Sequence, residues 1–259
     1  MPPTITGLIL TYNGERLLDR CLASLSFCDR VLVVDSFSTD GTERIARERG
    51  AAFVRRAWEG PGPQFRYALD LIDADYASDW IVSLDQDEIC TPELRESILK
   101  AVAAPAENVG FYVPRRSWYY DRFLKHSGWY PDHLLRCFRR GAMRVSVSGA
   151  HYSFHPQGPT GTLTGDILHY PYSSFREHLD KINSYAQQGA EALASRGKHG
   201  GIALGLLHGF GRFLRIYLLK KGFLDGRAGF INAAHGAFYA FLKYVRVDEG
   251  NWGYPYNHR

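Results

Sequence analysis

The chain has 259 residues, of which 45% are hydrophobic and 22% are charged, and its formal net charge is +4. This composition excludes a disordered chain, and the length is sufficient for one large domain, or one and a half, with a substantial core. The four cysteines are scattered without a C-x-x-C pair, which is typical of small buried side chains in a reducing compartment. The start "MPPTITGLILTYN" does not resemble a secretory signal. We expect no transmembrane helix, because no run of about eighteen apolar residues is uninterrupted.

Strand and helix patterns alternate over about the first hundred residues. The runs that predict strands are "ITGLILTY", "RVLVVD", "AAFVRRA" and "DWIVSLD", and the runs that predict helices are "ERLLDRCLASL", "TERIARERG" and "GPQFRYALDLI". This alternation predicts a parallel sheet with helices on both faces. Ligands bind such sheets at the carboxyl ends of the strands. The polar residues expected at those ends are Asn13, Asp35, Asp40, Asp85 and Asp87.

One buried strand ends in "SLDQDEIC", which places Asp85, Asp87 and Glu88 within four residues. Carboxylates this close repel one another unless a positive group joins them. Side chains two apart on an extended segment point the same way, so Asp85 and Asp87 can face one ligand. Hard oxygen ligands suit Mg²⁺ or Mn²⁺ beside substrate phosphates. We therefore predict a divalent cation here, while a solvated loop before a helix remains the alternative.

A dinucleotide site is disfavoured by the same part of the chain. The first strand runs into "TYNGER" and not into a G-x-G-x-x-G loop, so no glycine loop cradles a pyrophosphate. The segment "GPGPQ" contains prolines that would hinder close approach of a ligand to the backbone. The carboxylate of Asp35 at its strand end could still contact a ribose.

From about Gly110 the sequence changes to aromatic-rich and arginine-rich strands and hairpins. The segment "SSFREHLDKINSYAQQGAEALA" predicts a helix that begins near Ser173 or Ser174, and two amphipathic stretches follow at 202–221 and 227–246. Residues 202–247 contain seven basic residues and one acidic residue. Such stretches either pack as core helices or lie in the interface of an anionic membrane, and both interpretations remain open.

Five segments in register along nearly the whole chain resemble family 2 glycosyltransferases of the GT-A fold. They are "ILTYNGERLLDRCLASL", "VLVVDSFSTDGT", "AWEGPGPQFRYALD", "DWIVSLDQDE" and "GWYPDHLLRCFRRG". Within that family they are most similar to bacterial lipopolysaccharide core heptose β-1,4-glucosyltransferases, and the tail "YLLKKGFLDGRAGF" shares the similarity. The resemblance implies an α/β fold with a Rossmann-like, mostly parallel central sheet, helices on both faces and C-terminal amphipathic helices.

The same resemblance implies an activity. We expect a metal-dependent, inverting transfer of a hexose, with glucose the expected sugar, from a UDP-sugar to a sugar hydroxyl of a lipid-linked bacterial glycan. The lipopolysaccharide inner core is such a glycan. The cofactor is expected to be Mg²⁺ or Mn²⁺. Two alternatives stay open: a polyprenyl-phosphate glycosyltransferase, and a nucleotide-sugar-binding protein without turnover.

The resemblance also implies roles for single residues. Nucleotide-sugar binding is expected at Thr11, Asn13, Glu15, Asp35, Ser38, Asp40, Gln64, Arg66 and Asp85. Metal binding is expected at Asp87 and His169, and the base that activates the acceptor is expected to be Asp132, with Glu88 as the second candidate. Acceptor binding is expected at Arg115, Arg116, Trp129, Tyr130 and Arg136, where arginine would suit a phosphorylated acceptor.

The domains and the location follow from these assignments. We expect a catalytic domain over residues 1–200, with a nucleotide-sugar half at 1–105 and an acceptor half at 106–200. A helical, membrane-associating segment is expected at 201–259. The protein would then lie in the cytoplasm on the inner face of the bacterial inner membrane, in contact with anionic lipid through residues 202–246. No nucleic-acid partner is expected.

The chain departs from the family pattern at two places. Gln86 stands between the two aspartates where the family commonly has alanine, and we interpret this change as neutral. His151 and Tyr152 stand where the family commonly has His-Glu, which removes a carboxylate. The role of that second segment is therefore open.

Overall fold

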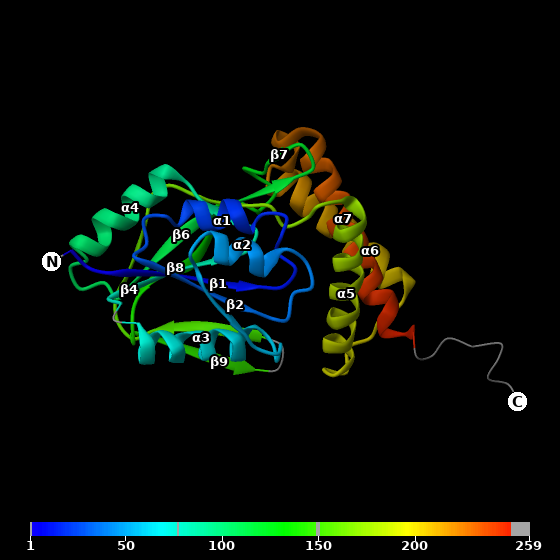
Figure 1. The fold of residues 1–259 in the computed structure, drawn as a ribbon. Coiled ribbons are helices and arrows are strands. Elements are labelled where there is room, and N and C mark those ends of the chain that lie inside the picture. The colour runs from blue at the N-terminus through cyan, green and yellow to red at the C-terminus, as the bar shows by residue number, and fades with distance from the viewer. Residues whose placement is uncertain (1, 77, 149–150, 250–259) are drawn as a thin grey trace, which may run out of the picture. The chain divides into compact units, whose positions relative to one another are not determined.

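The computed structural model describes residues 2–76, 78–148 and 151–249, and these form two compact units (Figure 1). The first unit comprises Met1–Arg116 and Pro131–Tyr170, and the second comprises Ser117–Tyr130 and Pro171–Arg259. Helix α5 (Phe175–Ala194) packs on helix α7 (Gly226–Val247), so the contacts do not divide the chain at residue 200. The expected assignment of separate functions to residues 1–200 and 201–259 stays a prediction.

The first unit is built on parallel strands in the order β3-β2-β1-β4. These strands are β1 (Ile5–Thr11), β2 (Arg30–Asp35), β3 (Ala52–Arg55) and β4 (Trp80–Asp85). The helices beside them are α1 (Leu18–Ser24), α2 (Thr42–Glu48), α3 (Pro61–Asp75) and α4 (Pro92–Ala103). Alternation along β1 explains the two cores, because Leu8 packs in the cluster that contains α3 and Ile9 in the cluster that contains α1. Figure 1 shows α3 on the opposite face of the sheet from α1 and α2. The predicted α/β fold is confirmed.

Antiparallel strands extend this sheet beyond β4, in the order β8-β6-β12-β5. They are β8 (Asp132–Arg139), β6 (Gly110–Tyr119), β12 (Ile167–His169) and β5 (Glu88–Cys90). Two short strands, β7 (Arg122–Phe123) and β11 (Thr160–Thr162), pair with β6, while β9 (Met143–Ser148) and β10 (His151–Pro156) form a separate hairpin. The side chains of His151 and Tyr152 lie outside the described residues. The pairing of β12 with β5 sets His169 opposite Glu88, which positions the site described below.

The second unit is mainly helical. Helix α5 begins as predicted, because Ser174 is its N-cap and accepts a hydrogen bond from the backbone N–H of Glu177 (3.2 Å). Helix α6 (Ile202–Leu214) continues into the π-helical turn η1 (Arg215–Leu219), and the 3₁₀ turn η2 (Gly222–Asp225) leads into α7. Helices α6 and α7 approach closely at Gly205 and Gly209, where an added Cβ would lie 3.0 Å from a backbone carbonyl of α7.

The apolar surface of α6 is largely exposed. Ile202–Leu219 is long and apolar enough to cross a membrane by length and composition, with a mean hydropathy of 1.4, and 11% of it is buried. We did not expect such a segment, because Arg212 and Arg215 interrupt its apolar run. Leu206, Leu207 and Phe210 are each at least 60% exposed. Their side chains do not contribute to a core in the described part of the chain.

Candidate active site

The loops after β1 and β2 are hydrogen-bonded to each other. Asn13 donates from its backbone N–H to Oγ of Ser38 (2.8 Å), and its Oδ1 accepts from the backbone N–H of Thr39 (2.9 Å). The φ of Asn13 is 48°, a left-handed conformation that asparagine tolerates better than most residues. The backbone N–H of Glu15 donates to Oδ2 of Asp40 (3.1 Å). Four residues with expected roles in donor binding therefore lie together at the carboxyl ends of these strands.

Asp40 is held as a carboxylate within this loop pair. Partial burial raises its pKa, but hydrogen bonds from the side chain of Thr42 and from the backbone N–H of Glu15 outweigh burial, so the net shift is downward. The Oδ1 atom of Asp40 accepts from the Thr42 hydroxyl (2.5 Å) and from the Thr42 backbone N–H (3.1 Å). These bonds fix the loop at the start of α2 and leave its backbone shape well defined.

Asp35 ends β2 and is fully buried. Its carboxylate accepts hydrogen bonds from the backbone N–H of Ser38 (2.8 Å) and from the Ser38 hydroxyl. Gln64, also fully buried, donates from Nε2 to Oγ of Ser36 (3.1 Å), so it lies beside the same loop. Arg66 is exposed and donates to a backbone carbonyl of β9, so the structure does not bring its guanidinium into this group.

Gln86 links the loop after β1 to the end of β4. Its Oε1 accepts from the hydroxyl of Thr11 (2.5 Å) and from the backbone N–H of Tyr12 (2.8 Å), and its Nε2 donates to the carbonyl of Tyr12 (3.0 Å). These three hydrogen bonds give Gln86 a structural role, whereas we interpreted its difference from the alanine common in the family as neutral. In the sequence, the feature that could have indicated this role is a polar amide side chain between the two aspartates at the end of the strand.

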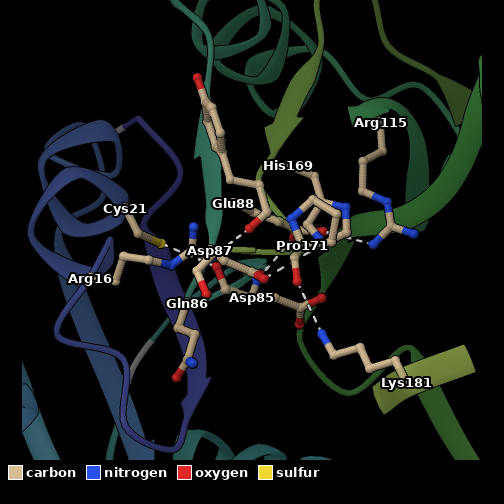
Figure 2. A network of polar contacts seen from close by, with 12 residues as sticks. Arg16, Cys21, Asp85, Gln86, Asp87, Glu88, Arg115, His169, Pro171 and Lys181 are labelled. Atoms are coloured by element: carbon tan, nitrogen blue, oxygen red, sulfur yellow. Dashed lines mark hydrogen bonds and ion pairs between the residues drawn. The ribbon is translucent and has the colours of Figure 1, made fainter. Parts of the chain in front are cut away.

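Two arginines explain how the acidic run tolerates its position. Arg136 on β8 is buried, and its Nη2 donates to Asp85 (2.5 Å) and to Glu88 (2.9 Å). Arg115 on β6 donates to Glu88 (3.0 Å) and to Oδ2 of Asp132 (2.7 Å). Figure 2 shows Asp85, Asp87 and Glu88 gathered with Arg115 and His169. The antiparallel strands thus supply the positive charge that the sequence required.

Asp85 and Glu88 share the guanidinium of Arg136, but their pKa values shift in opposite directions. Burial raises the pKa of Asp85, but the charge and the hydrogen bond of Arg136 outweigh it, so the net shift is downward. Glu88 is enclosed completely, and its burial raises its pKa more than Arg136 lowers it. Asp85 is therefore the more strongly ionised partner of this pair.

Asp87 and His169 lie beside this cluster. Their Oδ2 and Nε2 atoms are 3.7 Å apart, and the backbone N–H of Tyr170 donates to the carbonyl of Asp87 (3.0 Å). Ligand atoms around one Mg²⁺ or Mn²⁺ lie about 3 to 4 Å apart, so the pair fits a shared cation, and the imidazole favours Mn²⁺ over Mg²⁺. Even without a charge on Glu88, three carboxylates (Asp85, Asp87 and Asp132) and two guanidiniums gather here, which leaves a net negative charge for a cation to balance.

The expected acceptor-binding residues are distributed over both units. Arg116 is ion-paired with Asp166, and Arg136 holds Asp85 and Glu88, so both guanidiniums already have carboxylate partners. Trp129 and Tyr130 both belong to the second unit. The ring centroid of Trp129 lies 5.3 Å from that of Tyr119. Their roles in acceptor binding stay predictions.

An α/β sheet with polar and acidic side chains at the carboxyl ends of its strands is typical of α/β proteins that bind ligands at that edge. The sequence model described as Glycosyl transferase family 2 matches residues 8–157, and the chain belongs to this family. The lipopolysaccharide core biosynthesis glycosyltransferase LpsC of Rhizobium meliloti (strain 1021) is 31% identical over 255 residues, which cover 94% of this chain and 91% of that protein. The resemblance inferred from the sequence is therefore confirmed.

Other known proteins are more distant. The uncharacterized glycosyltransferase RT0209 of Rickettsia typhi (strain ATCC VR-144 / Wilmington) is 26% identical over 258 residues, which cover 95% of this chain and 87% of that protein. Among solved structures, glucosyl-3-phosphoglycerate synthase from Mycobacterium tuberculosis is 23% identical over 46% of this chain and 44% of that chain. Its TM-score is 0.37, a similarity too low to support an argument about this site.

Proposed function

We propose that this glycosyltransferase transfers a hexose, with glucose the expected sugar, from a UDP-sugar to a sugar hydroxyl of a lipid-linked bacterial glycan. The similarity to an enzyme of lipopolysaccharide core biosynthesis, over 94% of the chain, makes the inner core the preferred acceptor. The observation that carries the proposal is that Asp87 lies 3.7 Å from His169, while Asp132 is joined through Arg115 to Glu88, the next residue in the chain after Asp87.

The donor would bind across the ends of β1, β2 and β4. The joined loops around Asn13 and Ser38 offer backbone and side-chain groups to the nucleoside, and Gln86 holds the first of them against β4. Asp87 and His169 would hold a divalent cation, which when bound stabilises the negative charge of the departing diphosphate. Asp85, kept ionised by Arg136, would face the ribose or the sugar.

Asp132 is the better candidate for the base. In an inverting transfer a base accepts the proton of the acceptor hydroxyl while that oxygen attacks the anomeric carbon. The side chain of Asp132 is 42% exposed, and Arg115 holds it through one oxygen, Oδ2, so the group is both accessible and oriented. Glu88 is fully buried between Arg115 and Arg136 and cannot reach an acceptor. Its role would be to position these two arginines.

A lipid-linked acceptor also gives the exposed apolar side of α6 a function. Leu206, Leu207 and Phe210 would lie among acyl chains at the cytoplasmic face of the inner membrane, with the basic residues of 202–247 near anionic headgroups. The same exposed helix favours a second candidate, a polyprenyl-phosphate glycosyltransferase. This candidate shares the donor site and differs in the acceptor.

The deciding experiment measures transfer of radiolabelled sugar from UDP-glucose with Mn²⁺ or with EDTA. The acceptors are lipopolysaccharide truncated to its inner core and, separately, polyprenyl phosphate. We expect Mn²⁺-dependent labelling of the truncated lipopolysaccharide, with a product whose anomeric configuration, read by NMR, is inverted. Labelling of polyprenyl phosphate alone would establish the second candidate. UDP-glucose binding without transfer to either acceptor would contradict both.

A further inference from the structure

The second unit contains a cleft of 510 Å³ that the donor site does not use. It is lined by α6, η1, α7 and the loop after β7. Four cationic side chains line it: Arg212, Arg215, Lys220 and Lys243. Its lining residues include no carboxylate. We call this feature the basic cleft.

The cations of the basic cleft differ from the arginines of the strands in the first unit that carry the candidate site. Arg115, Arg116 and Arg136 each form an ion pair, whereas none of the four cleft cations pairs with a carboxylate in the part of the chain that the structure describes. Two of them lie against aromatic rings: Arg212 is 5.0 Å from the ring centroid of Tyr239, and Lys243 is 5.0 Å from that of Tyr244. The positive charge of the cleft is therefore not balanced within the described chain.

The pKa of Lys243 reflects how close these like charges lie to one another. Burial lowers the pKa of its ammonium group, and the nearby charge of Arg212 lowers it further. An anion in the cleft would reverse this effect by stabilising both cations. The π-helical turn η1 contributes Arg215 to the same cleft, and such turns occur frequently at functional sites.

We propose that the basic cleft binds a phosphate group. Guanidinium groups donate paired hydrogen bonds to phosphate oxygens, and ammonium groups add point charges, so two arginines and two lysines match a phosphate monoester or diphosphate. The proposal goes beyond the transferase activity, because it requires neither the donor nor the transferred sugar. The phosphate could belong to a lipid headgroup or to a soluble phosphorylated molecule.

The surroundings of the cleft fit a phosphate that is attached to a lipid. Leu207 lines the cleft and is 66% exposed, and Leu206 and Phe210 are exposed on the same helix. If a lipid headgroup occupies the cleft, the acyl chains of that lipid can contact exposed apolar side chains of the same helix. Burial of large apolar side chains against acyl chains is favourable, so this arrangement would favour a lipid phosphate over a free one.

Helix α6 contains one position at which the charge of the cleft can be changed without a steric clash. Gly211 lines the cleft, and a Cβ built there meets no atom within 4 Å. Gly211→Glu would place a carboxylate beside the four cations, and replacing glycine inside a helix improves its helix propensity. Gly211→Gln fills the same space without the charge. A second variant, Arg212→Gln/Lys243→Gln, removes two of the cations directly, with the exposed Lys198→Gln as a charge-loss control outside the cleft.

The test uses the full chain and two probes. Binding of glycerol 3-phosphate is measured by calorimetry, and binding to phosphatidylcholine vesicles that contain phosphatidic acid is compared with vesicles of equal surface charge that contain phosphatidylserine. We expect Gly211→Glu and the double variant to weaken binding by about tenfold or more, and Gly211→Gln and Lys198→Gln by less than about twofold.

The two probes separate the sources. Cleft-dependent preference for phosphatidic acid vesicles identifies a lipid headgroup, and cleft-dependent binding of glycerol 3-phosphate without that preference identifies a soluble phosphate. If both probes bind the variants as well as the parent chain, or if neither binds the parent chain, the proposal is wrong. Thermal unfolding of each variant confirms that it is folded, so a loss of binding is not a loss of structure.

Discussion

Oδ2 of Asp87 and Nε2 of His169 lie 3.7 Å apart, although Asp87 lies two residues after the end of β4 and His169 ends β12. The register of β12 against β5 produces this pairing, because it sets His169 opposite Glu88. A carboxylate and an imidazole at this separation can share one divalent cation.

The first prediction concerns that pair. Asp87→Asn and His169→Gln should each weaken Mn²⁺-dependent binding of UDP by about tenfold or more, because metal ligands and their neighbours typically contribute that much to affinity. Calorimetric titration of UDP with Mn²⁺, and again with EDTA, measures the effect. The exposed His199→Gln is the control. Equal UDP affinity with and without metal in the parent chain would show that no cation takes part in UDP binding at this site.

Asp132→Asn should lower the transfer rate by about 10² to 10⁴ while UDP affinity changes little, since general base catalysis contributes that range. The amide keeps the shape of the side chain and can still accept a hydrogen bond from Arg115. Transfer kinetics and UDP titration on the same preparation separate the two effects. Asp70→Asn, an exposed change on α3, should leave both unchanged. Near-normal turnover of Asp132→Asn would show that another group takes the proton.

Gln86→Ala should destabilise the first unit by about 1–3 kcal/mol, because it removes three hydrogen bonds that join Thr11 and Tyr12 to β4. UDP affinity should fall as well, since the loop after β1 loses its support. Denaturant unfolding and UDP titration measure these changes. Gln187→Ala, on the exposed side of α5, is the matched control. Parent-like values for both quantities would support the neutral interpretation of this residue.

Stability should depend on pH through His178. Burial, together with the nearby charges of His235 and Lys181, lowers the pKa of this imidazole from 6.5 to about 4. Between these two values the unfolded chain binds the proton more tightly than the folded chain, so stability is lost as pH falls from about 6.5 toward 4. From pH 7.5 to 5.5 the contribution lost is roughly 1 kcal/mol.

Denaturant unfolding of the parent chain and of His178→Gln at these two pH values tests that contribution. The variant removes the titrating group, so its free energy of unfolding should fall less on acidification than that of the parent chain. His199→Gln, a change at an exposed histidine, should retain the parent dependence. An identical pH dependence in His178→Gln and the parent chain would assign the effect to other groups.

Leu206→Ser/Phe210→Ser should reduce flotation with anionic vesicles by about tenfold or more in partition coefficient, because each side chain loses roughly 1.5–3 kcal/mol of burial in the membrane interface. Both residues are at least 60% exposed, so the change should leave folding intact. Leu99→Ser/Leu179→Ser removes exposed leucines from α4 and α5 as a control. Flotation that is equal for all three proteins would show that α6 does not contact lipid.

The sequence by itself determined the elements that depend on local patterns. Buried apolar runs and helical spacing predicted β1 to β4 and the helices between them, and the serine N-cap predicted where α5 begins. These signals are local, because hydrophobic periodicity and capping involve residues within a few positions of one another. The strand-end location of Asp35, Asp85 and Asp87 followed from the same patterns.

Tertiary structure alone decided which side chains meet. The arginines of β6 and β8 look like a free basic surface in the sequence, yet strand pairing commits Arg115 and Arg136 to the acidic cluster. Four cations without carboxylate partners in the described chain line the basic cleft, where Arg212 and Lys243 come from two packed helices. Charges and metal ligands act over a few ångströms in space, and antiparallel pairing between distant strands sets those distances. Local sequence patterns contain no information about that pairing.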